Sequence, residues 1–229
     1  MKTCKELVKK ENENLAKDVK LQRYWDLLPN GRELIKQWFD RGWERRDCPP
    51  KQSFEPFIYT WFAFNGWASC VTGRDSDTEW RDALSLTPRL YDDFSCFASS
   101  RNPEGLELAQ KFYQCWPIFD AKDIKKNNAH FYEERASREE AIKHYFDKGV
   151  KKYQPACLKR HTNGKGAVPL DLDWPHTLSA LYQLRCNLFH GEKGTDSEMD
   201  QKLVHSGFQL LVHFLKYAEY LEKWVGDIL

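Results

Sequence analysis

Several features that identify common protein classes are missing from this sequence of 229 residues. Its seven cysteines are odd in number and form no C-x-x-C pair, so neither a disulfide framework nor a cysteine zinc site is expected. The longest apolar run, FIYTWFAF at 57–64, is well short of the ~20 residues that cross a bilayer. The net charge is only +1, so no global basic field is present to hold large nucleic acids. These absences favour a protein with reduced thiols and no membrane span.

The N-terminal segment also lacks the apolar stretch that a secretory signal contains. Residues 1–20, MKTCKELVKKENENLAKDVK, are charged throughout. Together with the unpaired cysteines, this predicts a cytoplasmic protein.

Strand-like alternation of polar and apolar residues is missing too, whereas helical spacing recurs along most of the chain. Hydrophobic residues make up 41% of the sequence, and nine Trp, fourteen Phe and ten Tyr are available to fill a core. The sequence therefore predicts an all-α helical bundle. We expect an N-terminal helical extension over 1–50 and a bundle over 51–229, joined in one continuous domain.

Apolar spacing and helix-start signals predict the individual helices. We expect helices near 4–20, 31–46, 53–71, 76–85, 88–99, 104–114 and 137–150. The second of these places an apolar stripe on one side, formed by Leu34, Ile35, Trp38, Phe39 and Trp43.

The segment SFEPFIYTWFAFNGWASCV at 53–71 is apolar on nearly every face, which is typical of a helix in the centre of a bundle. Ser53 is its expected N-cap. Asn65 lies inside it, and a structural hydrogen bond is expected there because an unpaired buried amide costs roughly 1–3 kcal/mol.

Two long helices are predicted at the C-terminal end of the chain. The segment DLDWPHTLSALYQLRCNLFHG starts a helix at Asp173 or Trp174, since the proline that follows suits a first helical turn, and ends it at Gly191. Asp196 or Ser197 then caps a final helix whose apolar residues recur at core spacing over 203–225. The short connection GEKGTDS predicts that the two helices form an antiparallel hairpin.

A basic segment precedes these two helices. KGVKKYQPACLKRHTNGKG at 148–166 contains no acidic residue, and its basic residues are Lys148, Lys151, Lys152, Lys159, Arg160 and Lys165. Such a run is most often a solvated surface, and the alternative interpretation is a guide for an RNA backbone.

Signals for metal or nucleotide binding are weak. The run GRDSDTEW at 73–80 is similar to the start of a calcium loop but has Trp80 where that loop requires glycine. TNGKG at 162–166 lacks the full phosphate-loop pattern. His205 and His213 have no cluster of cysteine or histidine around them. We therefore expect no metal and no cofactor.

The remaining candidate is YQLRCNLFHG at 182–191, where Arg185 and His190 lie near the predicted helix end. At ~100° per residue the two side chains are separated by about 140°, so a regular helix does not stack them, although the long arginine can reach round. His190 faces the negative end of the helix dipole, which favours its protonated form. On spacing alone, the pair either caps the helix or serves phosphate chemistry.

An arginine, four residues and a histidine at the end of one helix, followed by a long helix, resemble the signature motif of the HEPN superfamily. The helix FEPFIYTWFAFNGW is similar to those of larger HEPN proteins from bacterial defence loci, so the resemblance covers residues 53–225. It implies a helical bundle that dimerises, so that two motifs meet in a metal-independent endoribonuclease site. Arg185 and His190 have the motif roles. Cys186 stands where many members have a polar residue, and the polar residue here is Asn187.

RNA cleavage without metal needs a base, an acid and positive charge at the phosphorane. We assign proton transfer to His190, bidentate phosphate binding to Arg185 and orientation of the histidine or substrate to Asn187. We expect the RNA backbone to be guided by five basic residues, Lys151, Lys152, Lys159, Arg160 and Lys165.

The resemblance implies a role in phage defence or as a toxin. Expected partners are RNA, a second copy of the chain, and an antitoxin or a defence-complex protein. The alternative is a non-catalytic HEPN-like module that binds RNA, a nucleotide or a protein, and a third interpretation is an inert helical scaffold.

Overall fold

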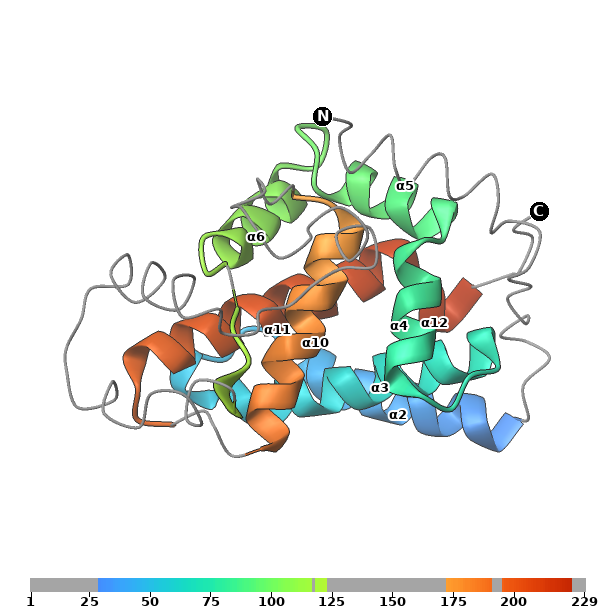
Figure 1. Cartoon of the computed structure of the whole chain (residues 1–229), viewed down its shortest axis with the longest axis horizontal. Coiled ribbons are helices and arrows are strands. Elements are labelled where there is room, and N and C mark those ends of the chain that lie inside the picture. The colour runs from blue at the N-terminus through green and yellow to red at the C-terminus, as the bar shows by residue number, and fades with distance from the viewer. Residues whose placement is uncertain (1–28, 117, 123–171, 191–194, 224–229) are drawn as a thin grey trace.

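The computed structural model describes residues 29–116, 118–122, 172–190 and 195–223 (Figure 1). These residues form helices and no β-strand, which confirms the all-α class for this part of the chain. No helix among them is both long enough and apolar enough to span a membrane. The elements are α2 (Pro29–Glu44), the 3-10 helix η2 (Pro50–Gln52), α3 (Phe54–Thr72), α4 (Asp77–Ser85), α5 (Pro88–Phe97), α6 (Pro103–Tyr113), α10 (Trp174–Phe189), α11 (Glu198–Ala218) and α12 (Tyr220–Lys223).

Helix α3 supplies much of the hydrophobic core, as its apolar sequence predicts. Phe57, Trp61, Phe64 and Trp67 are almost completely buried on it. Burying an aromatic side chain of this size contributes about 1.5–3 kcal/mol. α2 packs along α3, while α11 packs against both α3 and α6. Helix α3 therefore lies between α2 and α11 and contacts both.

Helix α2 belongs to the same core as α3. Ile35 and Phe39 are buried there, and Gly42 permits close approach, because a Cβ at this position would lie only 2.2 Å from Thr60 Oγ1. Leu34, which the spacing placed on the apolar stripe, is exposed. The buried stripe is narrower than predicted, since only Ile35 and Phe39 of its five residues are fully buried.

Local capping predicted the starts of α10 and α11. Asp173 accepts a hydrogen bond from the His176 amide at 3.0 Å, and Ser197 accepts one from the Asp200 amide at 3.3 Å. The same Asp173 carboxylate lies 2.6 Å from Nδ1 of the buried His176 ring. Of the alternative caps suggested by the sequence, Asp173 and Ser197 are thus the ones used.

The final helix is shorter than predicted. α11 ends at Ala218 because Glu219 has a left-handed backbone, with φ of 53°, and Leu221 lies in the separate helix α12. The turn places Tyr220 in the core, where its ring stacks on Trp67 at 5.1 Å and its hydroxyl donates to Asp93 at 2.9 Å. The break thus accompanies burial of both Tyr220 and Leu221 in the core.

Helix α10 packs chiefly against α4 and α5 and more lightly against α11. In Figure 1 it runs steeply across α11, so the side-by-side hairpin expected for these helices is not confirmed. α10 and α4 are antiparallel. Trp174 at the start of α10 donates to the Leu84 carbonyl near the end of α4 at 3.0 Å, and Arg185 near the end of α10 pairs with Asp77 at the start of α4.

Ser53 has the predicted N-cap position, but its side chain bonds elsewhere, and the hydrogen bond expected for Asn65 is not made by its Oδ1. Ser53 occupies the N-cap position of α3, but its hydroxyl donates to the Pro49 carbonyl at 3.3 Å and lies 2.7 Å from His205 Nδ1, and it caps no helix amide. Asn65 Oδ1 is buried without a hydrogen-bond partner in the described part of the chain. Spacing along α3 carries no information about α11, which delivers His205 to Ser53.

Candidate functional site

The motif that the sequence singled out forms the last turn of α10. His190 is the C-cap, and its amide donates to the Cys186 carbonyl at 3.1 Å. The imidazole is exposed, and among the described residues it makes no hydrogen bond, ion pair or ring contact. This separates it from His176, His205 and His213, whose rings have polar partners on other residues.

The guanidinium of Arg185 is held on three sides. Its Nη2 lies 3.1 Å from Asp77 Oδ2, its Nη1 donates to Cys186 Sγ at 3.9 Å, and its Cζ lies 4.7 Å from the centre of the Phe189 ring. The Nε is buried with no hydrogen-bond partner in this part of the structure. A quarter of the side chain, 25%, is exposed to solvent. These contacts hold the guanidinium in place while part of the side chain stays exposed to solvent.

Asp77 is the partner that sequence reasoning missed. It lies in the first turn of α4, where the helix dipole favours a carboxylate, and its Oδ1 accepts a hydrogen bond from Trp80 Nε1 at 3.3 Å. Its second oxygen is thereby presented to Arg185. The sequence offered Asp77 only as part of a calcium-like run, and nothing in the local spacing connects it with α10.

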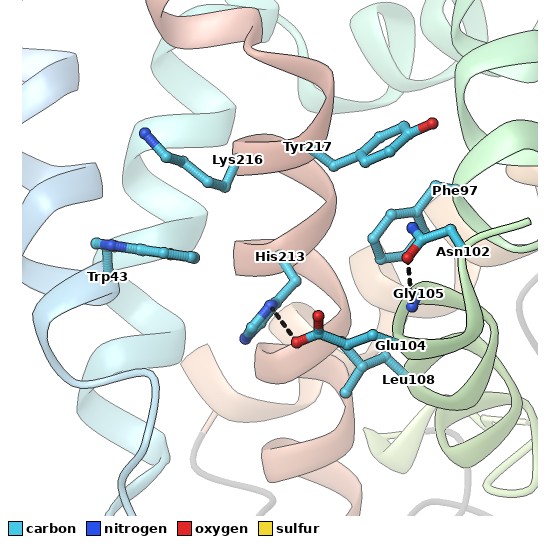
Figure 2. A pocket seen from close by; sticks show the side chains of 9 residues that line it. All are labelled: Trp43, Phe97, Asn102, Glu104, Gly105, Leu108, His213, Lys216 and Tyr217. Atoms are coloured by element: carbon cyan, nitrogen blue, oxygen red, sulfur yellow. Dashed lines mark hydrogen bonds and ion pairs between the residues drawn. The ribbon is translucent and has the colours of Figure 1, made fainter.

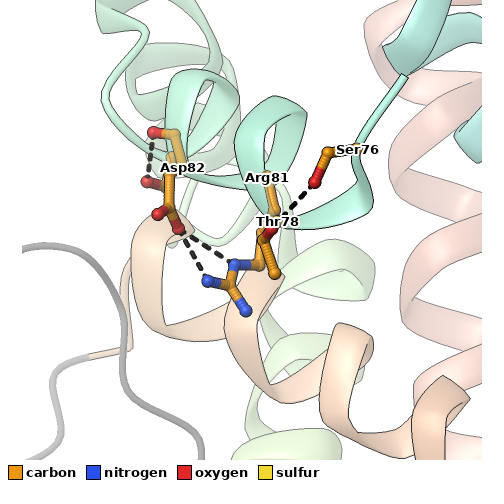
Figure 3. Close-up of polar contacts among 5 residues, drawn as sticks. Ser76, Thr78, Arg81 and Asp82 are labelled. Carbon is orange, nitrogen blue, oxygen red and sulfur yellow. Dashed lines mark hydrogen bonds and ion pairs between the residues drawn. The ribbon is translucent and has the colours of Figure 1, made fainter. Parts of the chain in front are cut away.

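A second arginine, Arg81, faces α10 beside Tyr182. Its Nε and Nη2 donate to the Asp82 carboxylate at 3.1 and 2.7 Å (Figure 3), and its Cζ lies 4.8 Å from the Tyr182 ring centre. Burial, followed by the nearby Cys186 and Asp77, raises the pKa of Tyr182 to about 12, while Arg81 opposes the shift. The phenol therefore stays neutral near pH 7 and does not act as a base there.

Asn187 is turned into the structure and is only 3% exposed. Its Oδ1 accepts from the Ala121 amide at 3.1 Å and from Gln183 Nε2 at 3.0 Å, while its Nδ2 donates to the Phe119 carbonyl at 2.9 Å. The side chain thus ties segment 118–122 to α10. It makes no hydrogen bond with His190 in the described structure, so its assignment to orienting the histidine or substrate stays a prediction.

The other expected features lie outside the described residues. They are the helices near 4–20 and 137–150 and the basic residues Lys151, Lys152, Lys159, Arg160 and Lys165. Where the structure does describe the chain, no group of three or more His, Cys, Asp or Glu side chains is placed to hold a metal ion.

A separate cavity of about 180 Å³ lies between α2, α6, α11 and the end of α5 (Figure 2). His213 Nδ1 is 3.6 Å from Glu104 Oε1 at this cavity, and the imidazole lies 5.4 Å from the Trp43 ring. Burial lowers the pKa of His213, an effect that Glu104 opposes. No residue of α10 lines the cavity, so it is distinct from the Arg185–His190 site. Its volume is below the ~300 Å³ at which small-molecule pockets begin.

Comparison with other proteins assigns no family to the chain. No protein-family model matches it, and neither the curated proteins nor the solved structures give a significant match. The resemblance to HEPN proteins therefore rests on the motif residues and the helix FEPFIYTWFAFNGW alone.

Proposed function

We propose that this protein is a metal-independent endoribonuclease of the HEPN type, with His190 and Arg185 as its reactive pair. The observation that carries the proposal is a contrast along α10. His176 and Asn187 are buried and hydrogen-bonded, whereas His190 is exposed and its ring makes no hydrogen bond, ion pair or ring contact with another described residue. Polar side chains that serve packing are normally bonded in this way. The imidazole is therefore available to a substrate.

The environment of Arg185 suits binding of a phosphate. Asp77 pairs with Nη2, and within the described residues Nη1 is bonded only to the thiol of Cys186, which is a weak acceptor. A phosphate oxygen is a much stronger acceptor and can replace the sulfur at Nη1 while Asp77 keeps the guanidinium in place. Loss of the weak hydrogen bond to Cys186 costs little free energy. The ion pair with Asp77 therefore holds the arginine in place while Nη1 can still bind a substrate.

In the proposed reaction, a neutral imidazole of His190 takes the proton from the RNA 2′-hydroxyl, and O2′ attacks the adjacent phosphorus. The bond to the 5′-oxygen breaks, that oxygen takes a proton, and the products are a 2′,3′-cyclic phosphate and a 5′-hydroxyl. Arg185 stabilises the charge on the phosphorane. One imidazole does not serve as base and acid in the same step, so we assign the acid to His190 of a second copy.

A non-catalytic RNA-binding or protein-binding module is the second candidate. It is favoured by the ion pair between Arg185 and Asp77 and by the three structural hydrogen bonds of Asn187, since these contacts also suit a purely structural end of α10. Such a module binds RNA without breaking it.

Cleavage of RNA in excess EDTA tests the proposal. The purified protein should cut single-stranded RNA, leave a 2′,3′-cyclic phosphate and spare DNA of the same sequence. RNA with 2′-O-methyl groups at every position is the control for the chemistry, because its nucleophile is blocked. Binding without cleavage would support the module, and cleavage that stops in EDTA would contradict the metal-independent mechanism.

The shared site also predicts a homodimer, and sedimentation equilibrium should give a mass of about twice the chain's 27.1 kDa. A strict monomer that cleaves RNA at the full rate would remove the requirement for a second histidine.

A further inference from the structure

A row of aromatic side chains leads away from Arg185 across three helices. We define the aromatic strip as Trp38 of α2, Tyr59 and Phe62 of α3, and Phe189 of α10. The Trp38 ring centre lies 5.5 Å from that of Tyr59 and 5.3 Å from that of Phe62, which in turn lies 5.9 Å from that of Phe189. The C-terminal end of α10 reaches the α2–α3 pair at the lower edge of Figure 1. The strip is therefore continuous with the candidate site.

These rings are not part of the buried core. Phe62 is 36% exposed and Phe189 is 45% exposed, and Trp38 and Tyr59 are partly covered. On the opposite side of α3, Trp61 and Phe64 are completely covered. α3 thus places one set of aromatic rings in the core and a second set at the surface. Large aromatic side chains gathered at a surface typically mark a binding site.

Arginines lie over the rings at both ends of the strip. The Cζ of Arg41 is 5.7 Å from the Trp38 ring centre and 5.9 Å from that of Tyr59, and the Cζ of Arg185 is 4.7 Å from that of Phe189. Within the described chain, no carboxylate forms an ion pair with Arg41. Flat rings flanked by guanidinium groups form a surface on which unpaired bases stack and to which phosphates are attracted.

Charge favours a polyanion over a second copy of the chain as the occupant. If the strip packed on its own copy about a two-fold axis through its centre, Arg41 of each copy would be buried at the Arg185 end of the other, where Asp77 is already paired with Arg185, and burying a cation without a partner is unfavourable. A nucleic acid strand brings a phosphate at each nucleotide and so complements both ends. A duplex hides the faces of its bases, whereas a single strand exposes them.

We propose that the aromatic strip binds the unpaired bases of single-stranded RNA and delivers the strand to Arg185 and His190. The delivery step rests on the proposed ribonuclease function, but the binding step does not. Base stacking on Trp38, Phe62 and Phe189 provides affinity without sequence preference, and Arg41 attracts the backbone at the far end.

Binding of an uncleavable probe by the parent protein tests the strip. The probe is a fluorescein-labelled single-stranded 2′-O-methyl oligoadenylate, measured by fluorescence anisotropy against a duplex of the same length. Phe62→Leu keeps an apolar side chain but removes the flat ring, so it should weaken binding of the single strand about tenfold. Arg41→Gln should weaken binding and reduce its dependence on salt. Tyr217→Leu is the matched control, because Tyr217 is an aromatic residue that is 47% exposed and lies outside the strip.

Unchanged affinity in Phe62→Leu, or equal affinity of the parent for the duplex, would overturn the proposal. Dissociation of a dimer by Phe62→Leu would also overturn it, by assigning the strip to contact between copies. Thermal unfolding of each variant verifies that it is folded. If the parent binds through the strip but cleaves no RNA, the strip stands and the ribonuclease fails. If it cleaves RNA and Phe62→Leu changes neither binding nor KM, the strip fails and the ribonuclease stands.

Discussion

Replacement of Asn187 by alanine tests whether this motif residue stabilises the fold by binding segment 118–122 to α10. Asn187→Ala removes three hydrogen bonds, to the Ala121 amide, the Phe119 carbonyl and Gln183 Nε2. The position is only 3% exposed, so water does not readily replace the lost partner of the two backbone groups. A net hydrogen bond contributes about 1 kcal/mol, and a backbone group left unpaired costs about 1–3 kcal/mol. We therefore expect the free energy of unfolding to fall by about 2–4 kcal/mol.

Gln183→Ala is the matched control for this loss. It removes one of the three bonds and leaves Asn187 bound to both backbone groups, so it should cost about 1 kcal/mol or less. Both variants are compared with the parent by urea unfolding, followed by circular dichroism and tryptophan fluorescence. In a chain of 229 residues, Asn187→Ala should lower Tm by roughly 5–15 °C.

The result that refutes this reasoning is an Asn187→Ala variant within about 0.5 kcal/mol of the parent, a difference typical of surface substitutions. If that stable variant had also lost cleavage activity, Asn187 would have the catalytic orienting role suggested by the sequence. Loss of stability together with loss of the contact to 118–122 would instead assign it to the scaffold.

Two further predictions concern the ion pair at the site and two half-buried histidines, His205 and His213. Asp77→Ala should slow RNA cleavage but lower the free energy of unfolding by only about 1 kcal/mol or less, because the ion pair with Arg185 is partly exposed. Asp77→Glu keeps the carboxylate and should restore much of the cleavage rate. Cleavage assays and thermal unfolding of both variants measure these effects. Burial lowers the pKa of His205 and of His213 below 6.5, so the unfolded chain binds more protons in acid. Their contribution to the free energy of unfolding should be fully present above pH 6.5 and should be lost as the pH falls below it. Urea unfolding of the parent and of His213→Gln at several pH values measures this loss. An equal pH dependence in the two proteins would exclude His213 as a cause.

The elements of the fold were predictable wherever their signals are local. The starts of α10 and α11 follow from Asp173 and Ser197, whose side chains cap amides within three residues, and the burial of α3 follows from its apolar sequence. The break at Glu219 was not predictable in this way, because its benefit is the contact between Tyr220 and Trp67 on another helix.

The candidate site likewise has local features that the sequence predicts and long-range contacts that it does not. The motif at the end of α10 was visible in the sequence because its residues are neighbours. Its supports were not visible, since Asp77 reaches Arg185 from α4 and Asn187 binds the Phe119 carbonyl 68 residues away. Contacts of this kind depend on how helices pack, and helical periodicity defines which side of a helix is buried but not which residue it meets.

The rate of RNA cleavage by His190→Ala in EDTA is the most direct test of the central claim. Loss of a general acid or base lowers a rate by about 10²–10⁴-fold, so we predict cleavage at the background level together with unchanged helicity and Tm, since the exposed imidazole has no packing role among the described residues. His213→Gln, which alters a histidine outside the site, should cleave like the parent. If His190→Ala instead releases the same 2′,3′-cyclic phosphate products at the rate of the parent, His190 is not the proton-transfer group and the ribonuclease assignment is contradicted.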